Sequence, residues 1–320
     1  MKFLIVSDPT EGLKARTDTA LAFARAAIAR GHRVSWATAR DVGLSGPDVH
    51  VSAREIESLP DGALPRLARA GEPAALHGFD GVWIRRDPPF DAEYVSLCWI
   101  LQVEESRVRF INRPSLLLRL HEKLIPVLAV RAGLVPSKHL VPTLLTASYT
   151  DEASVARIAG EGPGGVVTKP WYGFAGHDVH VWDDARAAYA SLAREKGPLW
   201  ERALVQPLIP EVKTAGDRRV FFIDGRVRGD FVRLPRKGSW ISNLARGGSA
   251  ESRPMSAAER EICEGLGAFL KREGVAFAGA DLLAGRLSEV NITAPTGVVT
   301  LKELGGPDLA QEFVQLAEGK

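Results

Sequence analysis

The 320-residue sequence has little cysteine, no long hydrophobic run and almost no net charge. Its two cysteines, Cys98 and Cys263, have no CxxC partner, which argues against a disulfide framework. We expect both to be buried, reduced thiols. The first apolar run, residues 3–6, is too short for a signal peptide or a membrane span. The sequence therefore predicts a cytoplasmic protein with no membrane partner.

Charge and missing motifs narrow the function further. The 41 basic and 39 acidic residues are spread through the chain, which argues against a nucleic-acid partner. There is no GxxxxGK[ST] phosphate loop, no HExxH zinc motif and no nucleophile elbow. A GxGxxG match at residues 160–165 follows a predicted helix, the reverse of the dinucleotide-binding context. A nucleotide would have to be bound by another device.

Strands and helices alternate in the first part of the chain. Short apolar strands are predicted at residues 3–6, 34–37, 81–84 and 108–111. A helix begins at Thr17-Asp18, and the last strand leads into a helix that carries residues 116–124. This order predicts a parallel sheet that is covered on both faces.

The pattern changes from residue 140. Helices from Asp151 and Ala185 alternate with short strands and predict a small α+β lid. A hairpin at Asp224-Gly225, a helix over residues 257–272 and a hairpin around Ala284-Gly285 follow. We divide the chain into subdomains of residues 1–122, 123–201 and 202–320, and we expect them to pack together because no long linker separates them.

One candidate phosphate-binding segment is KPWYGFAG at residues 169–176. Lys169 ends a predicted strand, and Gly173 and Gly176 give the loop backbone freedom. A lysine offers a positive charge to a phosphate, and small residues let backbone N–H groups approach its oxygens. The alternative is an ordinary glycine turn. On the phosphate-binding interpretation, residues 171–178 form a mobile loop that closes and excludes water.

A second constellation consists of Asp281, Glu289 and Asn291, whose oxygens are the ligands that Mg²⁺ prefers. Side chains alternate between the faces of a strand, so a two-residue turn at Ala284-Gly285 would leave Glu289 on the face opposite Asp281. An odd loop or a bulge is required. A three-residue loop over residues 284–286, for example, would pair Asp281 with Glu289. The alternative is a solvated hairpin edge.

Arginines recur at predicted strand positions and in a glycine-containing segment, at Arg219, Arg233 and Arg246. A forked guanidinium suits carboxylates and phosphates. Each of these arginines taken alone is more often a surface residue.

Several of these segments, in this order, resemble bacterial glutathione synthetases of the ATP-grasp superfamily. They are RDPPFD at 86–91, NRP at 112–114, EKL at 122–124, the Lys169 loop, NLARGG at 243–248 and EVNITAPT at 289–296. The resemblance runs from the first strand to about residue 297. It implies an ATP-grasp fold of the α/β class, with an N-terminal parallel α/β subdomain, a small α+β lid and a C-terminal α+β subdomain that carries the metal site.

The resemblance also implies the roles of residues. ATP would lie between the lid and the C-terminal subdomain, bound by Lys123, Lys169, Gly173, Gly176, Gln206, Pro207, Ile209 and Asp217. Asp281, Glu289 and Asn291 would hold Mg²⁺, with Mn²⁺ as the alternative ion. Arg219 and Arg233 would be catalytic. The substrate would be bound by Asp18, Arg86, Asn243, Arg246, Gly247, Gly248 and Thr293.

The implied reaction activates the carboxylate of γ-glutamylcysteine as an acyl phosphate, which glycine attacks to give glutathione, ADP and phosphate. The family also implies a homo-oligomer, a dimer or tetramer. The sequence departs from the family pattern at Ala175, in the segment 16–20 and after Thr296. Two alternatives therefore stay open: an ATP-grasp ligase that joins other substrates, and a nucleotide-binding protein without turnover.

Overall fold

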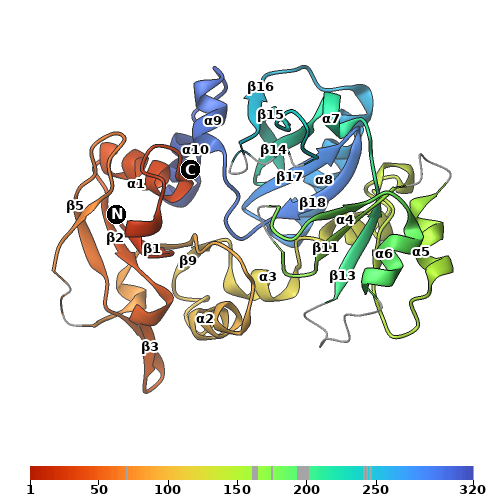
Figure 1. The fold of residues 1–320 in the computed structure, drawn as a ribbon. Helices are drawn as coiled ribbons and strands as arrows, with labels where there is room; N and C mark the ends of the chain where they lie inside the picture. The colour runs from red at the N-terminus through yellow and green to blue at the C-terminus, as the bar shows by residue number, and fades with distance from the viewer. Residues whose placement is uncertain are drawn as a thin grey trace.

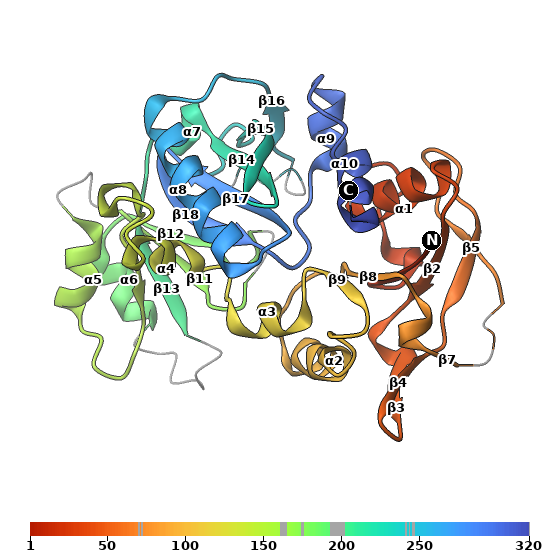
Figure 2. The same cartoon turned by 180° about the vertical axis from the view of Figure 1, so that it is seen from behind.

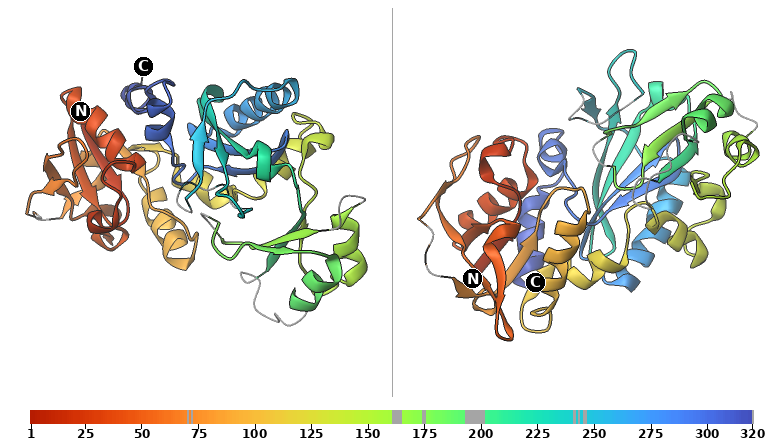
Figure 3. Two further views of the ribbon diagram at one scale, coloured as in Figure 1. Left: turned by 45° about the horizontal axis from the view of Figure 1, so that its top comes forward. Right: turned by 60° about the horizontal axis from the view of Figure 1, so that its bottom comes forward.

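The computed structural model describes residues 1–69, 71, 73–160, 165–173, 176–192, 202–240, 242, 244 and 247–319. The chain forms three parts, which we call the N-terminal unit, the lid and the C-terminal unit (Figures 1 and 3). None of the helices in these described ranges has the length and apolar character needed to cross a membrane.

The N-terminal unit is built on a six-stranded sheet in the order β6-β5-β2-β1-β8-β9. Four adjacent strands are parallel, as predicted: β2 (Arg33–Ala37), β1 (Lys2–Val6), β8 (Gly81–Ile84) and β9 (Arg109–Ile111), which ends the sheet. On the other side of β2, the sheet continues with two antiparallel strands, β5 (Arg54–Ser58) and the edge strand β6 (Arg66–Leu67). A small separate sheet contains β3 (Val42–Ser45), β4 (Asp48–Val51) and β7 (Ala74–Ala75). Short 3-10 helices are η1 (Thr10–Gly12), η2 (Ala39–Asp41), η3 (Leu76–Gly78) and η4 (Ser137–His139).

Helices cover both faces of this sheet, which confirms the prediction. α1 (Thr19–Ala29), capped by Asp18, lies on one face and α2 (Ala92–Gln102) on the other. The C-terminal helix α10 (Leu309–Glu318) returns to pack beside α1 (Figures 1 and 2), where the rings of Phe23 and Phe313 stack with centroids 3.8 Å apart. The two ends of the chain therefore share one core.

The expected helix over residues 116–124 is wrong, because the structure divides it. α3 (Pro114–Arg119) ends before an extended residue, Leu120, and α4 (Ile125–Arg131) begins after Lys123. Pro126 favours the break, since a proline has no N–H to donate to the carbonyl four residues earlier, that of Glu122. That carbonyl accepts instead from the N–H of Val290, at 3.1 Å. We call residues 120–124 the hinge segment.

The lid is a four-stranded sheet with two helices. Its strand order is β10-β13-β11-β12, and its elements are β10 (Leu144–Leu145), β11 (Val166–Pro170), β12 (His180–Trp182), β13 (Ala203–Pro207), α5 (Glu152–Ala159) and α6 (Ala185–Leu192). Asp151 caps α5 as expected. β13 follows the predicted boundary at residue 202, yet it pairs inside the lid sheet with β11.

The C-terminal unit is a five-stranded antiparallel sheet in the order β16-β15-β14-β17-β18. Its elements are β14 (Asp217–Ile223), β15 (Arg226–Leu234), β16 (Ser249–Glu251), β17 (Phe277–Leu283), β18 (Arg286–Asn291), α7 (Val212–Ala215), α8 (Ala257–Glu273) and α9 (Val298–Glu303). The predicted turn at Asp224-Gly225 is confirmed, with positive φ at both residues. α8 confirms the predicted helix and covers one face of the sheet with apolar side chains, among them Ile262, Leu266, Phe269 and Leu270. Cys98 and Cys263 are buried free thiols, and burial raises the pKa of each to about 12.

Candidate active site

A cleft of about 570 Å³ is lined by residues from all three parts of the molecule. The N-terminal unit contributes Asp18 and Asp87, the lid contributes Lys169, and the C-terminal sheet contributes Arg219 and Glu289. Of the predicted site residues, those that line the cleft are Asp18, Lys123, Lys169, Gly173, Gly176, Gln206, Pro207, Ile209, Asp217, Arg219, Arg233, Asp281, Glu289 and Asn291.

Strand alternation puts the charged residues of the C-terminal sheet on one face. Along β14, Arg219 faces the cleft, while its neighbours Arg218 and Val220 point to the α8 side. Arg219 pairs in register with Asp281 of β17, and Asp281 pairs in register with Glu289 of β18. One face of the sheet is therefore an apolar core surface, and the other carries arginines and carboxylates.

The hairpin β17–β18 reaches this register by a bulge. The pairing of Asp281 with Glu289 is confirmed, and of the two alternatives, an odd loop or a bulge, the structure has the bulge and not the three-residue loop. Arg286 pairs with Leu283, so the turn has only the two residues Ala284 and Gly285, both at positive φ. The register then shifts after Leu282, leaving one extra residue, Ser288, in β18. This extra residue turns Glu289 from the core face to the cleft face.

Asp281 is held by two guanidinium groups. Arg219 donates to it from Nε at 2.6 Å and from Nη2 at 3.1 Å, and Nη2 of Arg233 lies 2.9 Å from its Oδ1. Burial alone would raise the pKa of Asp281, but the two arginines outweigh that effect and lower it to about 2. Arg233 also donates to Asp217, whose pKa is raised because the carboxyl group is buried. Asp281 is therefore a carboxylate at neutral pH.

Two lysines from different parts of the chain approach Glu289. Nζ of Lys169, at the end of β11, lies 3.9 Å from Oε2 of Glu289. Lys123 lies in the hinge segment, and its Nζ donates to the carboxylate of Glu122 and, at 2.7 Å, to the carbonyl oxygen of Gly173. Both ammonium groups line the same cleft.

The two lysines differ in how well their charges are compensated. Burial lowers the pKa of Lys123, but Glu289 and Glu122 more than offset this, and the net pKa is raised. The pKa of Lys169 is lowered because burial dominates over the attraction of Glu289. Lys169 is thus the ammonium group with more to gain from an added anion such as a phosphate.

The segment that connects the lid to the C-terminal unit lines the cleft with Gln206, Pro207 and Ile209. The side-chain amide of Gln206 donates to Oγ1 of Thr143 at 2.8 Å, which holds it within the lid. The loop after β11 adds Gly173 and Gly176 to the lining. A Cβ on Gly173 would lie 2.3 Å from Cγ of Pro170, so only glycine fits there. Phe174 and Ala175 of the predicted mobile loop lie outside the described residues.

The predicted substrate residues are placed less uniformly. Asp18 lines the cleft, but its Oδ1 also accepts the capping bond from Leu21 at 2.8 Å. Arg86 is directed to α2, where it pairs with Glu93 and lies over the ring of Tyr94. The residues Arg86, Gly247, Gly248 and Thr293 do not appear in the described cleft lining. Asn243 and Arg246 lie outside the described residues.

Sequence reasoning left out two acidic residues of the cleft, Glu122 and Asp87. Burial, and next the charge of Glu289, raise the pKa of Glu122 to about 7. Burial also raises the pKa of Asp87 to about 6. A signal for Glu122 was present, because Pro126 disfavours a continuous helix through it.

Comparison with known proteins agrees with this geometry. Residues 1–118 match the N-terminal domain model of prokaryotic glutathione synthetase, and residues 136–306 match the ATP-grasp domain model of the same enzymes. The chain is 35% identical over 322 residues to a glutathione synthetase of Parasynechococcus marenigrum, covering 98% of each chain. It is 32% identical over 323 residues to one of Rhodopseudomonas palustris, covering 100% of this chain and 99% of that protein.

Solved structures support the fold alone. The D-cycloserine synthetase DcsG superposes with a TM-score of 0.67 at 18% identity, covering 99% of each chain. The ATP-grasp ligase PsnB, in a complex with a precursor variant, Mg and ADP, superposes with a TM-score of 0.62 at 17% identity, covering 99% of this chain and 98% of that chain. The chain has the ATP-grasp fold and belongs to the prokaryotic glutathione synthetase family.

Proposed function

We propose that this protein is an ATP-dependent ligase that joins γ-glutamylcysteine to glycine and gives glutathione, ADP and phosphate. The observation that carries the proposal is the register of β17 and β18, which puts Asp281 and Glu289 side by side at the cleft face. Lys123 and Lys169 line the same cleft. Carboxylates for a metal and ammonium groups for phosphates are what phosphoryl transfer needs.

The donor atoms fit a hard divalent cation. Glu289 and Asn291 lie on the same face of β18. Asp281 pairs with Glu289 from the neighbouring strand β17 and lies on that face too, and all three supply oxygen. We propose Mg²⁺, which would neutralise and orient the phosphate oxygens of ATP when it is bound. Mn²⁺ has similar ligand preferences. Asp281 now gives its oxygens to two arginines, so Glu289, at 24% side-chain exposure, is the more available carboxylate.

The protein's own residues position charge rather than form a covalent intermediate. Lys169 and Lys123 would bind phosphate oxygens, and Arg219 and Arg233 would stabilise the transferring phosphoryl group and the substrate carboxylate. Adenine would contact Gln206, Pro207 and Ile209, in the segment that connects the lid to the C-terminal unit. Asp18 and Asp87 lie where the N-terminal unit meets the cleft, and acidic groups there suit the ammonium group of a peptide substrate.

The test is phosphate release from ATP, with γ-glutamylcysteine and glycine each omitted in turn and the product identified by mass. We expect release to require both substrates. Release that proceeds with a different acceptor amine but not with glycine would overturn the assigned product. ATP binding without any turnover would indicate a nucleotide-binding protein instead.

We also propose a homo-oligomer, a dimer or tetramer. Trp99 in α2 is 62% exposed, and Val103 directly after α2 is 49% exposed, so the outer side of this helix offers apolar surface to a second copy. Light scattering should give at least twice the mass of one chain. A stable monomer at micromolar concentration would contradict the proposal.

A further inference from the structure

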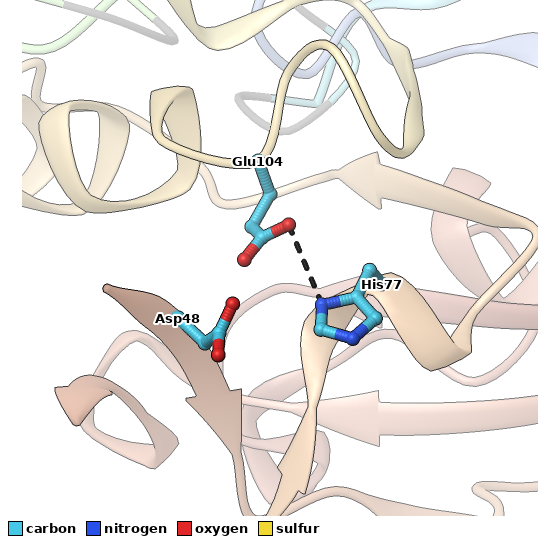
Figure 4. Close-up of side chains that lie close together, drawn as sticks. All are labelled: Asp48, His77 and Glu104. Carbon is cyan, nitrogen blue, oxygen red and sulfur yellow. Dashed lines mark ion pairs between the residues drawn. The ribbon is translucent and has the colours of Figure 1, made fainter. Parts of the chain in front are cut away.

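A second cluster of ionisable side chains lies outside the cleft, in the N-terminal unit. Asp48 begins β4, His77 lies in η3, and Glu104 follows the end of α2. The ligand atoms of these three residues all lie within 4.8 Å of one another. Figure 4 shows the two carboxylates and the imidazole directed toward a common point. β3 and β4 project from the bottom of the N-terminal unit in the views of Figures 1 and 2.

Glu104 is the observation that points to a ligand. Its side chain is 0% exposed, and its Oε2 accepts no hydrogen bond from any residue that the structure describes. The other oxygen, Oε1, accepts from the backbone N–H of Val49 at 3.2 Å. A buried carboxylate oxygen without a hydrogen-bond donor is costly, and the cation beside it, Nη1 of Arg107 at 3.4 Å, forms an ion pair with it but no hydrogen bond. Oε2 of Glu104 lies 3.6 Å from Nδ1 of His77, inside the cluster.

We propose that Asp48, His77 and Glu104 form a binding site for a divalent transition-metal ion, with Zn²⁺ as the ion that fits best. An imidazole with two carboxylates is a zinc-type ligand set with one position left for water, whereas Mg²⁺ prefers oxygen ligands alone. Zinc–ligand bonds of about 2.0–2.2 Å place two tetrahedral ligands about 3.3–3.6 Å apart. The separation of His77 and Glu104 already meets this requirement.

Asp48 is the ligand that has to move. It begins a strand directly after the turn between β3 and β4, and its side chain is 37% exposed, so it can approach without disturbing the core. Arg107 now competes with the proposed ion. Its Nη1 lies 2.8 Å from Oδ1 of Asp48 and 3.4 Å from Oε2 of Glu104. The side chain of Arg107 is 47% exposed, so its guanidinium group can turn into solvent when an ion binds.

The proposed ion would join β4, η3 and the end of α2. It needs neither ATP nor the ligase reaction, so the inference stands or falls separately from the proposed function. Zinc binding should raise the midpoint of thermal unfolding, because the three ligands come from elements that separate when the chain unfolds.

The probe is Zn²⁺ alone, titrated calorimetrically into chelator-treated protein with Mg²⁺ in excess to occupy the oxygen ligands of the cleft. We expect one Zn²⁺ per chain. His77→Ala should weaken binding at least about tenfold, since even the outer partners of metal ligands are worth that much. His77 is one-third exposed, so this variant should fold, and Asp48→Asn provides a second test. His50→Ala, which removes an imidazole two residues from Asp48, is the matched control and should bind normally.

Arg107→Gln separates a metal site from a simple ion-pair cluster. It removes the competing cation and should tighten zinc binding, and Zn²⁺ should raise the unfolding midpoint of this variant and of the wild type but not that of His77→Ala. The proposal is overturned by any of three results: no saturable zinc binding, equal binding by wild type and His77→Ala, or weaker binding by Arg107→Gln.

Discussion

The hinge segment and the end of lid strand β11 each bring one lysine to the cleft, and the two lysines have different ion-pair partners. Lys123 of the hinge segment has a neighbouring carboxylate, Glu122, and a carbonyl acceptor on the lid loop. Lys169 of the lid has Glu289 at 3.9 Å as its ion-pair partner. The hinge lysine is therefore compensated within the free protein, whereas the lid lysine is arranged for an anion that comes with the substrate.

The different ion-pair partners of the two lysines indicate that the two lysines have different roles in the cleft. A lysine that is already paired holds the lid loop against the hinge segment, and a lysine that is underpaired provides binding energy for phosphate. Glu289 connects the two, because its charge acts on both ammonium groups.

The largest expected effect comes from removing that shared anion. Glu289→Gln keeps the shape of the side chain but removes a metal ligand and the charge that supports both lysines. We expect turnover to fall at least about 100-fold, the scale of losing one preorganised electrostatic contact. Steady-state rates at saturating Mg²⁺, together with a circular dichroism spectrum to verify folding, check this. Activity close to wild type would remove Glu289 from the metal site.

The second prediction separates the lysines by stability. Lys169→Met and Lys123→Met should both lose turnover. Only Lys123→Met should lower the free energy of unfolding. The pKa of Lys169 is lowered by burial, so its charge costs stability at neutral pH, and Met should leave the free protein as stable or more stable. Lys123→Met removes the partner of buried Glu122 and should cost about 1–3 kcal/mol.

Denaturant unfolding without nucleotide measures both changes. Equal destabilisation of the two variants would show that the lysines are supported alike, contrary to the comparison. ADP with Mg²⁺ should reduce the difference in stability between the two variants, since phosphate then supplies Lys169 with a second anionic partner.

Parts of this arrangement follow from the sequence and parts do not. The alternation of side chains along a strand shows that Asp281 and Glu289 can share a face only if the hairpin contains one extra residue. That requirement can be derived from the sequence. Whether the extra residue lies in the loop or in the strand depends on tertiary packing, because Ala284 and Gly285 can form either turn. The structure chooses a bulge at Ser288.

Contacts between residues far apart in the sequence were the other feature that sequence patterns could not predict. Local patterns predicted the parallel strands and α8, because apolar spacing reports which face is buried. They could not show that Arg219 and Arg233 converge on Asp281, or that α10 returns to α1, since residues far apart in sequence make these contacts.

The third prediction concerns pH and Glu122. Burial, with the nearby charge of Glu289, raises the pKa of Glu122 from 4.5 to about 7 in the folded protein. Between these values the folded chain holds a proton that the unfolded chain has lost, so this group's contribution to stability falls as pH rises. Glu122→Gln should therefore gain stability relative to wild type as pH rises from about 5 to about 8. Unfolding midpoints of both proteins across that range test this, and a constant difference would contradict it.

The smallest expected effect comes from Pro126, which defines the hinge segment by its missing N–H. Pro126→Ala should cost about 0.4–1 kcal/mol of stability through the greater freedom of the unfolded chain. The break in the helix should persist, because the N–H of Val290 still bonds the carbonyl of Glu122 at 3.1 Å, and the N–H of Lys123 still bonds Nδ1 of His121 at 3.2 Å. Lys123 would then keep its place, and KM for ATP should rise only a few-fold.

Pro114→Ala is the matched control, because Pro114 also begins a helix but has no part in the break beside Lys123. It should show a similar loss of stability with an unchanged KM for ATP. If Pro126→Ala instead lost activity as Lys123→Met does, the proline alone would hold the hinge lysine in the cleft. The two backbone hydrogen bonds would then be consequences of the break in the helix rather than causes of it. The difference between Lys123, whose charge is compensated in the free protein, and Lys169, whose charge is not, would depend on the missing N–H of one proline.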